Sequence, residues 1–208
     1  MRPFPGRVCN CTLIIMKAFS KSEIISIIII FIILIVVSWP NFALSLRRAR
    51  DQVRRDDVGN IQAAIDSYYN DYGIYPLSTS DGKIIACKNP SGPATSMVAC
   101  NWGHDPWINL TPGVNKVYMS TVPGDPNFGR GASYVYFSDG SRYQLFASFE
   151  GTDEAGYDSK LAALGIKCGS SKCNMGRSNN VPLYISIEAY DLQIYCGQHP
   201  GDLKCINK

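Results

Sequence analysis

The stretch "KAFSKSEIISIIIIFIILIVVSWPNF", residues 17–42, decides the architecture of this chain. Within residues 24–37 only Ser26 is not apolar, and the apolar character continues to Leu44. The 21 residues from 24 to 44, as a helix rising about 1.5 Å per residue, would just cross a hydrocarbon core of roughly 30 Å. The stretch therefore predicts either a membrane anchor or a signal that is removed.

Two residues do not suit a plain anchor. Glu23 lies at the threshold of the apolar run, and a carboxylate at the edge of hydrocarbon is costly unless it is paired or extends into the headgroups beside Lys21. Pro40 lacks a backbone donor, so we expect it to bend or locally melt the helix. Both residues require an explanation beyond hydropathy.

Length and charge limit the remaining possibilities. The chain has 208 residues, enough for one ordinary domain plus the N-terminal segment. Its net charge is only +3, and no basic stripe with interleaved aromatic residues appears, so no nucleic-acid partner is predicted.

Six of the eight cysteines follow the apolar run, which indicates a disulfide framework in an oxidising compartment. This places the N-terminus in the cytoplasm and the C-terminal domain outside. The short spacings favour three pairs: Cys87 with Cys100, Cys168 with Cys173, and Cys196 with Cys205. The alternative is a zinc site built from Cys196, His199 and Cys205, with Cys168 and Cys173 as further ligands.

Residues 43–73 predict a continuation of the helix. Arginines crowd its first half, and they are interpreted either as a solvated face with headgroup contacts or as a surface for subunit pairing. An apolar stripe follows at three- and four-residue steps and suits packing on a sheet. Gly73 and Pro76 predict the stop. The stripe consists of Val58, Ile61, Ile65, Tyr68 and Tyr72.

The rest of the chain is β-like and rich in turns. Residues 77–126 contain repeated Pro and Gly signals. Residues 132–150 form two alternating aromatic runs around Asp139 and Gly140, the strongest hairpin signal in the chain. Residues 182–196 are interpreted as one or two strands. The fold class is therefore α+β, with a long helix first and an antiparallel sheet after it.

The N-terminal segment resembles the class III signal of the type IV pilin and type II secretion pseudopilin family. In that family, prepilin peptidase cuts before a Phe, with Glu four residues and Pro twenty-one residues after it. Here Ala18 and Phe19 flank the expected cut, and Glu23 and Pro40 are in register. The resemblance is specific over residues 17–76, looser to Gly151, and absent beyond.

The resemblance implies a filament subunit with four segments. Residues 1–18 are a cleaved leader, 19–44 the transmembrane and assembly helix, 45–76 its amphipathic continuation, and 77–208 a β-rich, disulfide-stapled extracytoplasmic part. Phe19 would be N-methylated, and Glu23 would pair with the free amine of a neighbouring subunit. The implied partners are copies of the chain and other pilin-like subunits, prepilin peptidase, an inner-membrane assembly platform and, before assembly, membrane lipid.

The resemblance also implies a bound calcium ion, because major pseudopilins hold calcium in a loop after the hairpin. Asp153, Glu154 and Asp158 would supply hard oxygen ligands at that place. No other cofactor is expected.

Two other functions compete with the filament subunit. An ordinary signal peptide cut before Leu46 would release residues 46–208 as a secreted binding module. An anchored enzyme has little support, because His104 and His199 are the only histidines and no nucleophile elbow, phosphate loop or zinc-protease motif occurs. We therefore expect no catalytic residues.

Overall fold

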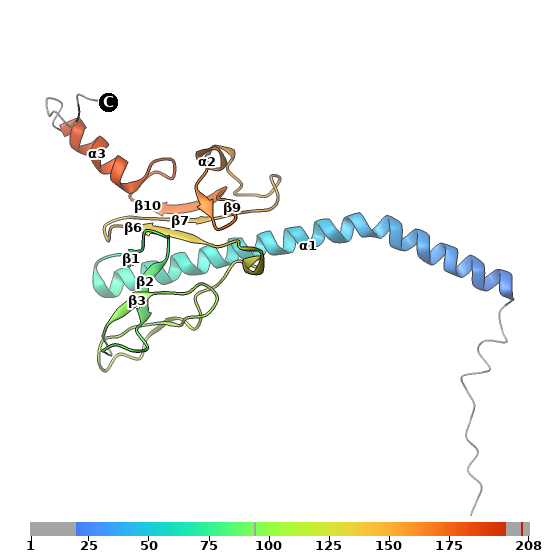
Figure 1. The fold of residues 1–208 in the computed structure, drawn as a ribbon, viewed down its shortest axis with the longest axis horizontal. Coiled ribbons are helices and arrows are strands. Elements are labelled where there is room, and N and C mark those ends of the chain that lie inside the picture. The colour runs from blue at the N-terminus through green and yellow to red at the C-terminus, as the bar shows by residue number, and fades with distance from the viewer. Residues whose placement is uncertain (1–19, 94, 199–204, 206–208) are drawn as a thin grey trace, which may run out of the picture. The chain divides into compact units, whose positions relative to one another are not determined.

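The computed structural model describes residues 20–93, 95–198 and 205. The chain divides into two compact units, Met1–Leu46 and Arg47–Lys208, and each is described by itself. One long helix, α1 (Lys21–Tyr72), contributes to both units (Figure 1). We call residues 21–46 the first half of α1 and residues 47–72 the second half.

The second half of α1 forms the spine of the larger unit. Val58, Ile61 and Ile65 are fully buried, and Tyr68 nearly so, which confirms the predicted apolar stripe. The helix ends as predicted at Gly73, whose φ of 71° lies in the left-handed region that favours glycine. The stripe therefore fixes which face of α1 meets the sheets.

The strands are short and antiparallel, in two three-stranded and two two-stranded sheets over the described residues. Residues from both three-stranded sheets join α1 in a single core, and Figure 1 shows α1 running alongside them. The strands are β1 (Leu77–Ser78), β2 (Ile84–Lys88), β3 (Met97–Ala99), β4 (Trp107–Ile108), β5 (Val117–Met119), β6 (Val135–Ser138), β7 (Tyr143–Ala147), β8 (Lys167–Cys168), β9 (Ser171–Lys172) and β10 (Met175–Asn179).

The hairpin predicted around Asp139 and Gly140 is confirmed. β6 and β7 pair in register from Val135 opposite Phe146 to Ser138 opposite Tyr143, and β10 pairs on the other side of β7. One face of this sheet joins α1 in the main core, as expected from its aromatic residues. The fold is thus α+β, with the long helix first.

The other face of the β10-β7-β6 sheet covers a second, smaller core. There Val135 and Phe146 contact Leu161 of α2 (Ser159–Leu164) and the disulfide between Cys168 and Cys173. The disulfide closes the β8–β9 hairpin against this core. A short 3-10 helix, η3 (Phe128–Arg130), precedes β6.

The interpretation of residues 182–196 as strand is wrong. The structure has β10 before this segment and a helix, α3 (Ile187–Gln198), within it. Ser186 begins the helix: its hydroxyl accepts from the amide of Ala189, and its carbonyl accepts from that of Tyr190. This is N-capping by serine, a local hydrogen bond that outweighs the weak alternation of apolar residues.

Candidate functional site

The threshold of the apolar run is organised around Glu23. The backbone amide of Ser20 donates to the Glu23 carboxylate at 2.7 Å, and the amide of Glu23 donates to the Ser20 hydroxyl at 3.3 Å. This reciprocal pair is a capping box, which satisfies two donors at a helix N-terminus. Glu23 therefore has a local partner, Ser20, within its own chain. The Ser-x-x-Glu spacing in the sequence is the signal that indicates this capping role. Ala18 and Phe19, the residues of the expected cut, lie outside the described residues.

Polar groups near this threshold gather on one side of the helix. Ser22, Glu23, Ser26 and Ile27 line an open hollow of about 340 Å³, and the Ser26 hydroxyl donates to the carbonyl of Ser22. Polar side chains in a membrane helix usually face another helix or water rather than lipid. The hollow is therefore the part of the first half of α1 best suited to a polar partner.

Pro40 does not interrupt the helix, because α1 is helical on both sides of it. Of the two expected effects, a bend or local melting, melting is not observed, because the helix is unbroken from Lys21 to Tyr72. Since proline has no N–H, the carbonyl of Val36 loses its helical donor. The apolar side chains around Pro40 are exposed, including Trp39 at 69 %.

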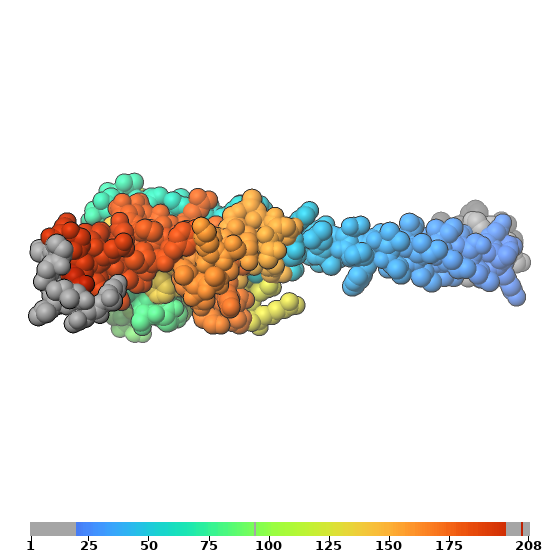
Figure 2. All heavy atoms as spheres, turned by 90° about the horizontal axis from the view of Figure 1, so that it is seen from above, coloured from blue at the N-terminus to red at the C-terminus, as the bar shows by residue number. Residues whose placement is uncertain are grey.

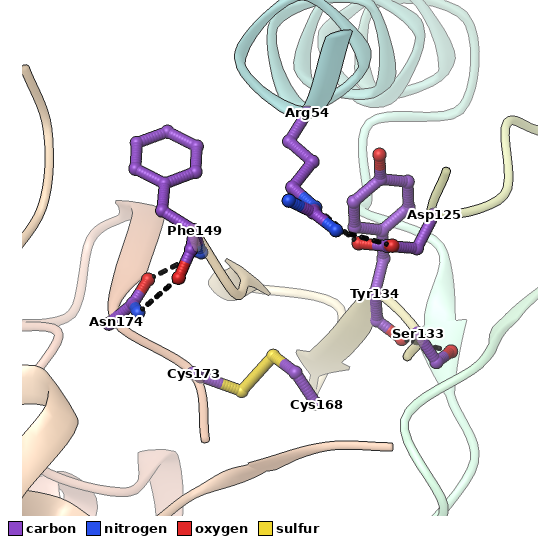
Figure 3. Close-up of a disulfide and its surroundings, with 8 residues drawn as sticks. All are labelled: Arg54, Asp125, Ser133, Tyr134, Phe149, Cys168, Cys173 and Asn174. Atoms are coloured by element: carbon purple, nitrogen blue, oxygen red, sulfur yellow. Dashed lines mark hydrogen bonds and ion pairs between the residues drawn. A yellow bond between two sulfur atoms is a disulfide. The ribbon is translucent and has the colours of Figure 1, made fainter. Parts of the chain in front are cut away.

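A buried ion cluster joins the second half of α1 to two distant loops. Arg54 is 1 % exposed and binds Asp125 through two hydrogen bonds of 2.8 and 2.9 Å (Figure 3). The same guanidinium also donates to Asp51 at 2.7 Å and to Glu150 at 2.9 Å. Two-point geometry of this kind is characteristic of strong arginine–carboxylate pairs. Below, "the buried ion cluster" means these four residues.

Asp51 also holds the loop that follows β7. Its carboxylate accepts from the backbone amides of Glu150 and Gly151, each at 2.9 Å. Buried amides need such partners, so Asp51 and Arg54 together fix the loop against the helix.

Neighbouring opposite charges shift the pKa values of Glu150 and Arg54. Hydrogen bonding to Arg50, against the effect of burial and with further help from Arg54, lowers the pKa of Glu150 to about 2. Burial by itself would lower the pKa of Arg54, but its bonds to Asp125, Asp51 and Glu150 raise it above the ordinary value. Glu150 and Arg54 are therefore both ionised near neutral pH.

The sequence interpretation of the arginines as a solvated face or a pairing surface is wrong for Arg54. The other arginines pair mostly within the same unit: Arg50 binds Glu150 at 2.6 Å, and Arg55 lies 3.4 Å from Glu154. Sequence alone could not have found the cluster, because Asp125 and Glu150 are more than 70 residues away from Arg54.

The three acids expected to hold calcium are engaged elsewhere. Asp153 forms ion pairs with Arg47 and Arg48. Asp158 caps α2 by accepting from two backbone amides, at 2.8 and 3.1 Å, and Glu154 pairs with Arg55. No three acidic, histidine or cysteine side chains in the described part of the chain are grouped as metal ligands. The calcium site stays a prediction.

The three expected disulfides are confirmed. They join Cys87 to Cys100, Cys168 to Cys173, and Cys196 to Cys205. The first two pairs are almost fully buried. Disulfide sulfurs are not thiolates, so these cysteines cannot serve as the zinc ligands of the alternative reading. His199 lies outside the described residues.

His104 is exposed, and its ring lies 6.3 Å from that of Phe128. Its backbone amide donates to the carbonyl of Asn101, while Asp105 accepts from the backbone amide of Asn101 at 2.7 Å. The carboxylate of Asp105 therefore stabilises the turn by accepting from the backbone and side-chain amides of Asn101.

No family model matches this chain, and neither do any of the curated proteins or solved structures compared with it. Within the part of the chain that the structure describes, one helix, α1, is long and apolar enough to cross a membrane. The likeness to pilins is therefore one of architecture: a long N-terminal apolar helix whose continuation packs on antiparallel sheets. The helix and the disulfides indicate a membrane-anchored or secreted extracytoplasmic protein.

Proposed function

We propose that this chain is a structural subunit of a type IV pilus-like filament, either a secretion pseudopilus or a pilus. Prepilin peptidase would cut it between Ala18 and Phe19, and it would polymerise through the first half of α1. One observation carries the proposal: α1 is continuous over 52 residues, yet its large apolar residues before Arg47 are exposed while its later stripe forms the domain core. The exposed apolar side chains of the first half would be buried by lipid first and by other subunits after assembly.

The role we assign to the chain is mechanical rather than catalytic. Its partners would be copies of itself and other pilin-like subunits, prepilin peptidase, an inner-membrane assembly platform, and lipid before assembly. The subunit would begin in the inner membrane, with its N-terminus in the cytoplasm, and end in a periplasmic or extracellular filament.

Glu23 has a specific part in this proposal. The capping box uses one of its oxygens, at Ser20, and the other has no hydrogen-bond partner among the described residues. This second oxygen would accept a cation of a neighbouring subunit. Bringing the carboxylate and an amine together removes two charges from an unfavourable environment at once.

The variant Glu23→Ala tests this role in the full chain. We expect membrane insertion at the normal level but few or no filaments by electron microscopy of the assembled material. Ser45→Ala is the matched control, because Ser45 lies outside the hollow and its hydroxyl donates to the carbonyl of Asn41 within the same helix. Normal filaments from Glu23→Ala would remove charge pairing from the proposal.

A secreted binding module remains the second candidate, and one observation favours it. The larger compact unit begins at Arg47, one residue after the start that signal peptidase would leave. That product would lack the whole first half of α1, so the two candidates differ in the mass of the mature chain.

A further inference from the structure

The β8–β9 hairpin presents two lysines side by side. Lys167 and Lys172 are direct cross-strand partners, and both are exposed. Like charges directly opposite each other destabilise a strand pair. Neither lysine forms an ion pair with any described residue. We call this feature the lysine hairpin.

The fold holds the lysine hairpin firmly in spite of the repulsion. The adjacent disulfide between Cys168 and Cys173 is buried in the smaller core. The hairpin is also bonded to the segment before β6, where the amide of Ser133 donates to the carbonyl of Cys168 at 3.3 Å. A rigidly held, uncompensated positive pair is suited to an acidic partner.

An acidic pocket lies at the other end of β6. It has a volume of about 310 Å³ and is lined by Phe137, Ile187, Asp139 and Glu188, among others, with no lysine or arginine. Glu188 has no ion-pair partner in the described part of the chain. The apolar walls suit the stem of a lysine, and the carboxylate of Glu188 suits its ammonium group. Asp139 is already engaged, because its carboxylate accepts from the amides of Ser141 and Arg142 and lies 3.9 Å from the Arg142 guanidinium.

The two features face different ends of the same strand. The lysine hairpin is bonded to the segment just before β6, and the acidic pocket includes Ser138 and Asp139, where β6 ends. In Figure 2 the orange segments and red α3 lie toward opposite ends of the larger unit. One chain therefore cannot join its own hairpin to its own pocket, but successive copies can do so head to tail.

The charge of the larger unit favours a second copy as the partner. Of the 20 Lys and Arg residues four precede Arg47, and of the 17 Asp and Glu residues only Glu23 does, so residues 47–208 are formally neutral. A neutral unit with separated positive and negative sites tends to associate with itself.

We infer that the lysine hairpin of one subunit docks in the acidic pocket of the next, with a lysine stem on Phe137 and Ile187 and its ammonium group near Glu188. This contact rests on the proposed filament function and names which surfaces of the outer domains meet. Because the contact is heterologous, it can repeat without closing.

A charge exchange in the full chain tests the inference. Lys172→Glu and Glu188→Lys should each reduce the yield of filaments roughly tenfold, and the double variant should restore it to within about twofold of the wild type. Lys88→Glu is the matched control, since Lys88 is an exposed lysine at the end of β2; it should leave the yield unchanged. Mapping of the three disulfides in every variant checks the fold.

The outcomes separate the two claims. A wild-type chain that forms no filaments contradicts the proposed function and the contact that rests on it. Wild-type filaments that survive both single exchanges overturn the contact alone. Loss in both single variants without rescue in the double variant also overturns it, because the hairpin and pocket would then meet other partners.

Discussion

The two halves of α1 share one secondary structure but have opposite surroundings. In the second half Val58, Ile61 and Ile65 are fully buried against the sheets of their own chain, whereas in the first half large apolar residues such as Ile30 and Phe31 are 56 % and 63 % exposed. Helical propensity therefore does not distinguish the halves. The chain itself buries the apolar side chains of the second half, whereas those of the first half stay exposed. In the proposed function, lipid and then other subunits cover the first half.

Polar residues follow the same division. Carboxylates of its own chain neutralise Arg54. Among the described residues, the Glu23 carboxylate accepts only from the backbone amide of Ser20, and the charged residue nearest to it in the sequence is Lys21. Changes in the second half should therefore alter the stability of the folded domain. Changes in the first half should alter insertion and assembly instead.

The largest expected effect on stability is at the buried ion cluster. Arg54→Ala leaves Asp51 and Asp125 buried without their cation, and breaking such a pair costs about 3–5 kcal/mol. Urea unfolding of the full chain in detergent, followed by aromatic circular dichroism, measures this loss. The control is Arg48→Ala, whose side chain is 58 % exposed and should contribute less than about 1 kcal/mol. Equal losses from the two variants would contradict the role of the cluster.

A matched isoleucine pair compares the halves directly. Ile61→Ala should lower the free energy of unfolding by about 2–5 kcal/mol, because it opens a cavity in a packed core. Ile30→Ala should change it by less than about 0.5 kcal/mol, because its side chain meets no protein core. The same urea experiment gives both numbers. A large loss from Ile30→Ala would mean that the first half of α1 is part of the domain after all.

Acid should weaken the larger unit through Glu150. Its pKa is about 2 in the folded chain, below the ordinary 4.5, so its ionised form stabilises the fold above pH 4.5. That contribution is lost as the pH falls from 4.5 toward 2. Thermal unfolding measured across this interval should show a smaller dependence on pH in Glu150→Gln than in the wild type. An unchanged slope would show that Glu150 is not paired in solution.

Calcium should have the smallest effect. Arginines already neutralise Asp153 and Glu154, and Asp158 caps α2, so an ion would have to displace these contacts. We expect the same melting temperature in excess calcium and in excess chelator. A rise in calcium that disappears in Asp153→Asn would instead support the site predicted from the family resemblance.

Sequence was most informative where local chemistry decides the structure. The stripe from Val58 to Tyr68, the stop at Gly73 and the turn at Asp139 and Gly140 were all predicted, because each depends on periodicity or on a turn residue. The disulfides were predicted from short spacings between cysteines.

Predictions from the sequence failed where the structure depends on distant residues or on competing local signals. Arg54 looked like a surface charge, and only the folded chain brings Asp125 to it across 71 positions. α3 was predicted as strand because Ser186 was not recognised as a cap. The capping box of Ser20 and Glu23 was not predicted, although the two residues have the Ser-x-x-Glu spacing of that motif.

The central claim is that the first half of α1 is retained for assembly, and the mature N-terminus tests it most directly. The measurement is the intact mass and N-terminal sequence of the chain taken from its native membrane. The filament proposal predicts a chain that begins at Phe19 and carries one methyl group on its amine. A chain that begins at Leu46 would contradict it, because the first half of α1 would then have been discarded.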